Sequence, residues 1–276
     1  MAAAFLFCVT GCKANRPLEE RAEKEPEESF AQNESGEVMS QVLDVTQAAL
    51  QPELVTVEFT DEEDAQYDDD GTELLSWSFQ YPDIMIPGNP AAAEEINAYF
   101  SDEKTREESV IRDYTDNAKE EYEFSKEESL PFSAWELRFR NAVQRKDSVC
   151  ISFTQQLIEY AGGAHPNSYE SAVNFDGKTG KKLLLADVVS NVDTAHRETE
   201  EFIRKEIEEK YRDYVMEDYE ENIGDILTED AWYLDGNGFS IICNEYIIGP
   251  HAMGIVVFTI PYDECGFLKE NYKSFQ

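Results

Sequence analysis

The chain is poor in the residues and motifs from which enzymes usually build active sites. It has only three histidines, and its 276 residues contain no GxSxG elbow, HExxH helix, P-loop or Rossmann glycine pattern. Catalysis would therefore need residues scattered along the chain. The sequence predicts a protein that is not an enzyme, with no cofactor and no metal site.

Basic residues are also scarce. The chain has 23 Lys and Arg against 59 Asp and Glu, for a formal net charge of −36 at pH 7. Such a charge repels phosphates, so it argues against nucleic acid as a partner and against direct docking on anionic lipid. Two interpretations stay open. The acidic surface either keeps a protein soluble outside the cytoplasm or attracts a cationic partner in a salt-dependent way.

The five cysteines do not form a redox or zinc motif, because no pair has CxxC spacing. Cys150 and Cys243 lie within apolar strand patterns, so we expect buried free thiols at both positions. In an oxidising location the alternative is one disulfide among Cys150, Cys243 and Cys265.

No apolar run approaches the roughly 20 residues that span a bilayer. The apolar segment 1–11 ends in small residues before Cys12, which is the pattern of a bacterial lipoprotein signal peptide. A plain signal peptide is the alternative. We expect a lipid on Cys12 as the only membrane anchor, a charged, disordered tether at 12–51, and a body held outside the bacterial cell membrane.

The remaining residues alternate between strand and helix patterns. Alternating or apolar runs predict strands at residues 53–59, 73–82, 135–144, 149–160, 169–175, 182–186 and 254–261, the second ended by proline and the last buried on both faces. Residues 232–243 are predicted to form a hairpin around 235–238. Helical spacing predicts two long helices, at 90–122 and 194–215. The predicted class is α+β, with two small halves, each a mainly antiparallel sheet with one long packed helix. We place these halves at 52–185 and 186–276.

Two acidic runs, 61–64 and 68–71, raise the question of a calcium loop. Gly71 at the sixth position of an EF-hand would place Gln66 first and Trp77 twelfth, where Asp and Glu are required. The pattern fails, so an acidic hairpin turn is the better interpretation.

The most distinctive local sequence is the loop at 160–167, which joins two predicted strands. Gly162 and Gly163 permit a positive φ or a close backbone approach, and Pro166 biases His165 toward an extended conformation. The loop is therefore expected to present a histidine at a bend.

His251 lies in a second loop that contains glycine and proline, at 249–254, whereas His196 falls on the polar side of a helix. If the two loops converge, His165, His251 and an acid such as Asp176 would form a metal-binding or acid–base cluster. The interpretation we favour is that each loop histidine satisfies backbone groups at its own turn. A nucleophilic pair of Cys150 with His165 is disfavoured, because a thiol in a strand core is inert.

The loop sequences at 159–165, 174–180, 183–187, 245–254 and 258–262 resemble a paired domain-of-unknown-function family of bacterial surface proteins. That pair forms the outer part of RsiV-like anti-sigma factors, and its first module precedes some PdaC-type peptidoglycan deacetylases. The resemblance covers residues 54–268. It implies that 52–185 is similar to the N-terminal module of the deacetylases and that 186–276 is similar to the RsiV-like C-terminal module.

The resemblance implies binding of lysozyme-like proteins or of peptidoglycan, and the acidic charge favours a basic protein. The chain lacks the deacetylase domain and the sigma-binding segment of these relatives, so neither activity is carried over. We therefore expect a non-enzymatic, lipid-anchored surface protein, with Gly162, Gly163, His165 and His251 as candidate binding residues. The alternatives are a metal-dependent, cell-wall-acting hydrolase that uses the loop histidines, and a purely structural surface protein.

Overall fold

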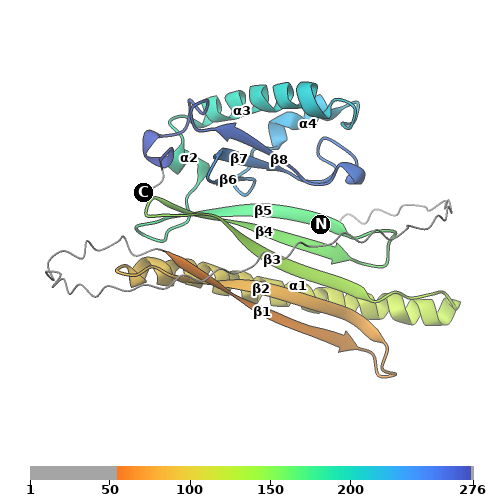
Figure 1. Ribbon diagram of the computed structural model, residues 1–276. Coiled ribbons are helices and arrows are strands. Elements are labelled where there is room, and N and C mark those ends of the chain that lie inside the picture. Colours follow the sequence, from red (N-terminus) through yellow and green to blue (C-terminus); the bar gives the residue numbers. More distant parts are fainter. Residues whose placement is uncertain (1–54, 275–276) are drawn as a thin grey trace, which may run out of the picture. The chain divides into compact units, whose positions relative to one another are not determined.

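The computed structural model describes residues 55–274, which lie within one compact unit. Residues 56–176 contain a five-stranded sheet with a long helix on one face, and residues 232–261 contain a three-stranded sheet with a shorter helix (Figure 1). The predicted α+β class is confirmed. Cys12 and the predicted tether lie outside the described residues.

The first sheet has the strand order β1-β2-β3-β4-β5. Its strands are β1 (Thr56–Tyr67), β2 (Glu73–Met85), β3 (Trp135–Lys146), β4 (Cys150–Tyr160) and β5 (Asn167–Asp176). All neighbours pair antiparallel except β2 and β3, because the long helix between them returns the chain to the same end of the sheet.

Two predictions for β1 and β2 are wrong. The acidic run 61–64 lies within β1, so the turn is confined to the residues around Asp68 and Gly71. β2 continues past Pro82, because β3 pairs only with residues 75–79 of β2. At Pro82 one side of β2 is therefore an edge, where a missing N–H group costs no ladder hydrogen bond.

Helix α1 (Pro90–Glu128) begins as the sequence predicts. Proline occupies the first helical position, and the Asn89 side chain accepts a hydrogen bond from the Ala92 backbone N–H. Ile96 and Phe100 pack against one face of the five-stranded sheet, and Ile111 packs against the same face further along. The apolar side of α1 therefore packs in the core.

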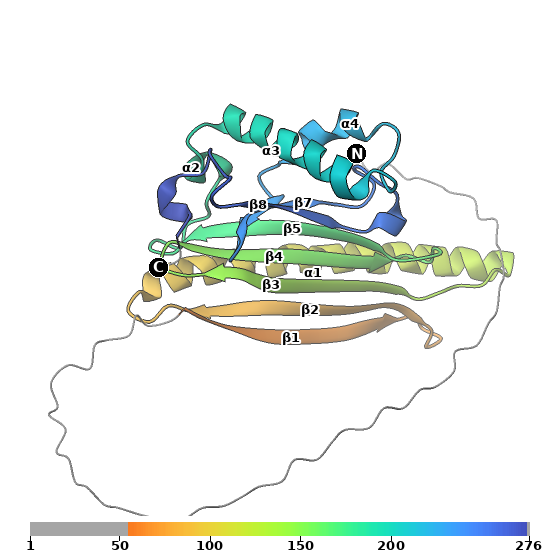
Figure 2. The ribbon, with the colours of Figure 1, turned by 45° about the horizontal axis from the view of Figure 1, so that its top comes forward.

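The second half contains α3 (Val192–Glu206) and a three-stranded antiparallel sheet in the order β6-β7-β8. The other elements are α2 (Leu185–Val188), η1 (Ile207–Tyr211), α4 (Tyr219–Asn222), η2 (Ile223–Asp225), β6 (Trp232–Leu234), β7 (Gly238–Cys243), η3 (His251–Met253), β8 (Val256–Pro261) and η4 (Glu270–Tyr272). Figure 2 shows α3 over this sheet, on the side away from β5. No helix within residues 55–274 combines the length and apolarity needed to cross a membrane.

Two predictions in this region are wrong. Residues 182–186 do not form a strand, since they make only an isolated bridge from Lys182 to Phe175 before α2 begins. β8 is not buried on both faces, because Val257 is exposed between buried neighbours. Helix α3 covers the face of β8 that carries Val256 and Phe258. Because β8 is an edge strand of the small sheet, its other face is left open at Val257.

The two halves meet where the small sheet packs on β4 and β5. The Asn174 side chain donates a hydrogen bond to the Trp232 carbonyl at 2.8 Å, and Cys150 of β4 belongs to the same apolar core as Trp232. Cys150, Cys243 and Cys265 are all buried free thiols, as the apolar patterns of Cys150 and Cys243 predict. The boundary at 185/186 stays a prediction.

Candidate binding site at the junction of the two halves

The loop between β4 and β5 is exposed and depends on one glycine. Gly162 has φ +79°, a conformation that costs little only for glycine. Its α-carbon faces α1, since a Cβ there would lie 3.5 Å from a carboxylate oxygen of Glu121. Gly163 has no positive φ, and a Cβ there would meet nothing closer than 3.8 Å. Gly162 therefore shapes the loop and Gly163 does not.

The two histidine loops converge. The rings of His165 and His251 stack with their centroids 3.7 Å apart and their planes 11° apart. Tyr246 continues the column, with its ring centroid 6.0 Å from that of His251 and its side chain 53% exposed. The result is a column of three flat rings at the surface, formed by residues from both halves.

A buried acid orients the middle ring of this column. The Nδ1 atom of His251 donates to Oε2 of Glu245 at 2.7 Å, and the Glu245 side chain is only 8% exposed. Tyr246, the next residue, has φ +66°, so the chain turns sharply between the acid and the ring that extends the column. Glu245 therefore holds His251 through a hydrogen bond to a ring nitrogen, and His165 packs against one face of the same ring.

The expected acid, Asp176, is not part of this cluster. It lies at the opposite end of β5 from His165, where its Oδ1 accepts backbone hydrogen bonds from Lys178 and Thr179 in the turn that follows. Of the two histidines only His165 bonds to its own backbone turn, through the Pro166 carbonyl at 3.0 Å. The sequence interpretation missed Glu245, although it lies six residues before His251.

The ring column does not have the geometry of a metal site. Nitrogen lone pairs lie in the plane of an imidazole, so two nearly parallel rings cannot direct them at one point. Within residues 55–274 no group of three or more His, Cys, Asp or Glu side chains is placed to hold a metal ion. Cys150 is fully buried on β4, and burial raises the pKa of its thiol to about 11, so it does not pair with His165.

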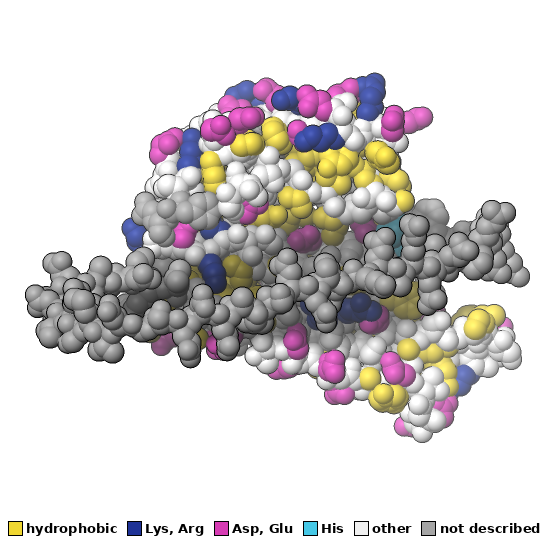
Figure 3. Space-filling model, viewed as in Figure 1, with side chains coloured by type: hydrophobic (Ala, Val, Ile, Leu, Met, Phe, Trp, Pro, Cys, Tyr) yellow, Lys and Arg dark blue, Asp and Glu magenta, His cyan; other side chains and the backbone are white. Residues whose placement is uncertain are grey.

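Carboxylates border the loop that carries His165. Glu121 of α1 lies beside Gly162, and Glu159 of β4 accepts a hydrogen bond from Asn167 at the end of the loop. Figure 3 shows acidic side chains spread over the visible surface, with a small patch of histidine between the two halves. An exposed column of rings with an acidic border is suited to contact with cationic groups.

The fold and this junction define a protein of two α+β modules whose loops meet at one surface. Comparison with protein families finds two matches. Residues 69–168 match the family described as Deacetylase PdaC, and residues 186–263 match the family described as Protein of unknown function (DUF3298). These matches support a DUF3298/PdaC-like domain family, as the resemblance of the loop sequences indicates.

Solved structures of DUF3298 family proteins have a similar fold. One from Bacteroides fragilis has 18% identity and a TM-score of 0.63, over 80% of this chain and 96% of the other. One from Pseudomonas aeruginosa PAO1 has 14% identity and a TM-score of 0.55, over 80% and 97%. A comparison with curated proteins finds no significant match. At these identities the structural likeness shows the fold alone.

Proposed function

We propose that this chain is a non-enzymatic protein of the bacterial envelope that binds a basic protein through the ring column of His165, His251 and Tyr246. In this proposal a lipid on Cys12 holds the body outside the cell. Its membrane contact is through that lipid alone. The observation that carries the proposal is the exposed stack of rings at an acidic junction of the two modules.

The rings suit the side chains that a basic protein presents. Guanidinium groups stack on flat rings, and lysine ammonium groups bind over the face of tyrosine. Because Glu245 and His165 already fix the middle ring, little side-chain entropy is lost when a partner binds. The net charge of −36 adds long-range attraction, which speeds the encounter with a cationic protein.

Peptidoglycan is the other ligand that the resemblance implies. Sugar rings would also lie flat on the column, but binding to an uncharged glycan would not depend on the acidic border. Salt dependence therefore separates the two ligands. Binding to a basic protein weakens as the Debye length falls from about 30 Å at 0.01 M salt to about 8 Å at 0.15 M.

Calorimetric titration with a cationic lysozyme tests the proposal. We expect saturable binding at about 10 mM salt that weakens at least about tenfold at about 150 mM salt. The double variant His165→Ala/His251→Ala should lose about tenfold in affinity, the usual effect of removing a central contact, whereas His196→Ala in α3 should bind normally. Absence of binding at low salt, or equal loss in both variants, would contradict the proposal.

One observation favours the hydrolase alternative enough to test it. A histidine oriented by a buried carboxylate, as His251 is by Glu245, is the usual arrangement of a general base. If the protein were such an enzyme, the purified chain would release soluble fragments from isolated cell walls, and His251→Ala would stop this release. We expect no release above that of a heat-inactivated control.

A further inference from the structure

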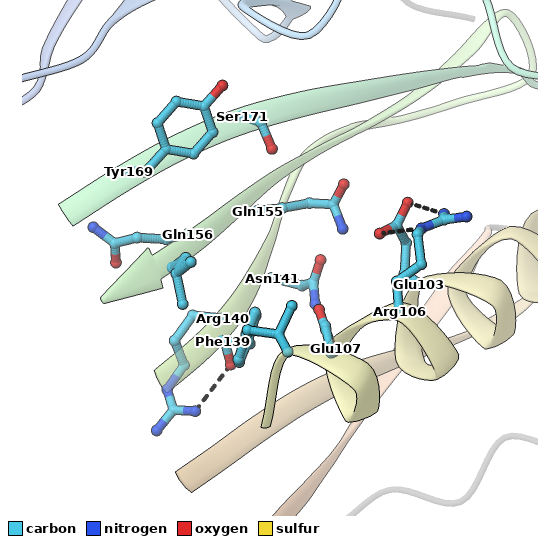
Figure 4. Close-up of a pocket in the computed structure, with 12 residues that line it drawn as sticks. Glu103, Arg106, Glu107, Phe139, Arg140, Asn141, Gln155, Gln156, Tyr169 and Ser171 are labelled. Carbon is cyan, nitrogen blue, oxygen red and sulfur yellow. Dashed lines mark hydrogen bonds and ion pairs between the residues drawn. The ribbon is translucent and has the colours of Figure 1, made fainter. Parts of the chain in front are cut away.

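A separate pocket lies beneath α1, on the face of the five-stranded sheet that the helix covers. Its volume is about 210 Å³. Figure 4 shows side chains from α1, β3, β4 and β5 around it. Apolar walls come from Val110, Phe139 and Leu157, and the polar side chains include Glu107 and Asn141.

Asn141 of β3 presents an acceptor without a partner. Its side chain is 7% exposed, and its Nδ2 donates to the Gln80 carbonyl at 2.6 Å. Since that bond fixes the orientation of the amide, Oδ1 is the atom left over, and it is buried with no hydrogen-bond partner. A buried acceptor without a partner destabilises the folded chain, so the fold gains if a donor occupies the pocket.

Glu107 of α1 presents a second acceptor. Its Oε2 is buried and makes no hydrogen bond of good geometry, although the Tyr81 hydroxyl lies near enough to lower the pKa of the carboxyl. Figure 4 shows the side chain directed with Asn141 into the space between helix and sheet. Burial raises the pKa of Glu107 to about 7.

The positive charge of the neighbouring Arg106 lowers the pKa of Glu107 in part, but its guanidinium is engaged by Glu103, with 3.2 Å from Nε to Oε2. Arg140 also lines the pocket, and its guanidinium donates to the Phe139 carbonyl and the Ser78 hydroxyl.

We propose that this pocket binds a primary ammonium group carried on a short aliphatic chain. Asn141 Oδ1 has no partner, and the Glu107 carboxylate can accept further hydrogen bonds beside the Tyr81 hydroxyl, so a ligand with several donors suits the pocket. An ammonium group has three donors. An anionic ligand would set acceptor against acceptor. A calcium ion takes six to eight oxygen ligands and makes no use of apolar walls, whereas a short alkyl chain packs against Val110 and Leu157.

The size of the pocket fits this class of ligand. A volume of about 210 Å³ corresponds to on the order of seven water molecules. It lies below the range of roughly 300–1,000 Å³ that is usual for drug-sized ligands. The pocket therefore admits a small amine or a single lysine side chain. The inference does not depend on the ring column, because none of the rings lines this pocket.

Ligand-observed NMR and calorimetry with n-butylammonium chloride test the proposal on the full chain at pH 8. We expect saturable binding in a one-to-one ratio, and no binding of sodium butyrate or 1-butanol at equal concentration. Glu107→Gln keeps the shape of the side chain but removes its charge, and should weaken binding at least about tenfold. Glu108→Gln, the exposed neighbour on α1, is the matched control and should bind as the wild type does.

A second variant separates loss of the ligand from loss of the fold. Asn141→Ser shortens the other acceptor, and it should also weaken butylammonium binding while the far-UV spectrum stays that of the folded chain. The proposal is wrong if butanol binds as well as butylammonium, or if Glu107→Gln and Glu108→Gln behave alike. It is also wrong if no small amine binds at millimolar concentration, in which case ordered water satisfies the two acceptors.

Two arms distinguish the sources of the ammonium group. A blocked lysine, Nα-acetyl-lysine methylamide, represents the side chain of a partner protein, and n-butylammonium represents a free small amine. If the blocked lysine and n-butylammonium compete for the pocket, the pocket is assigned to lysine side chains. Binding of butylammonium alone assigns it to free amines. Either result supports the ammonium site, and the lysozyme titration proposed above succeeds or fails independently of it.

Discussion

Replacement of Arg145 by alanine tests how the C-terminal segment is held against the first sheet. The Arg145 side chain is fully buried, and its Nε donates to Oδ2 of Asp147 at 2.7 Å. One Nη donates to the Tyr272 carbonyl at 2.6 Å and to the Tyr262 hydroxyl at 3.1 Å, and the other donates to the Ser274 carbonyl at 2.8 Å. One guanidinium on β3 thus binds three positions near the end of the chain.

The expected loss follows from what the substitution leaves behind. The Asp147 carboxylate, whose side chain is 8% exposed, would keep only the backbone N–H groups of Val149 and Cys150, which reach its other oxygen. Removing one partner of a buried ion pair costs about 3–5 kcal/mol, because a charge remains without compensation. That is a large part of the roughly 5–15 kcal/mol that stabilises a typical domain.

Urea unfolding followed by far-UV circular dichroism at pH 7 measures this loss. Arg145→Ala should lower the free energy of unfolding by about 3–5 kcal/mol, and Arg145→Lys should recover only part, since one ammonium cannot reproduce the planar fork. Arg138→Ala is the control. It removes an exposed ion pair with Glu136 and should cost about 0–1 kcal/mol. A loss in Arg145→Ala within about 1 kcal/mol of this control would refute the reasoning.

Three further predictions come from single positions. Gly180→Ala should destabilise the chain by more than about 1 kcal/mol, because the added Cβ would lie 2.2 Å from the Ala92 carbonyl oxygen. Gly71→Ala places its Cβ in open space and should cost less in the same unfolding assay. Because the folded-state pKa of Glu107 is raised to about 7, its contribution to stability is present below pH 4.5 and is lost as pH rises through 7. Glu107→Gln should remove this loss in unfolding curves from pH 4 to 8. Cys150 should react with a thiol reagent at pH 8 only as fast as the chain unfolds.

Much of the fold could be predicted from the sequence, because local pattern and tertiary environment agree in most elements. The start of α1 is determined by Asn89 and Pro90, which act on their own helix. The β3–β4 hairpin follows from alternation that the antiparallel register preserves. The wrong predictions lie where contact with a neighbouring element determines the local structure. Pro82 is tolerated only because β3 does not extend along that part of β2.

The candidate site could be predicted only in part. The glycine and proline content of the two loops pointed to His165 and His251, but their contact depends on how the small sheet packs on β5. No feature of the sequence indicated the pocket beneath α1. Glu107 is one acid among many in α1, and Asn141 is one polar residue in a strand. Only their burial between the helix and the sheet distinguishes them from other polar residues.

The ring column belongs to neither module alone, and this limits what each family match can imply. His165 comes from the half that contains the PdaC match, and His251 and Glu245 come from the DUF3298 match. Two hydrogen bonds between Asn244 and Glu170 set the position of one half relative to the other. The Asn244 side chain accepts from the Glu170 N–H at 2.7 Å and donates to the Glu170 carbonyl at 2.8 Å. Because Glu245 follows Asn244 directly, those two bonds place the acid that orients His251. Any change that separates the modules would therefore remove the proposed binding surface even if both modules stayed folded.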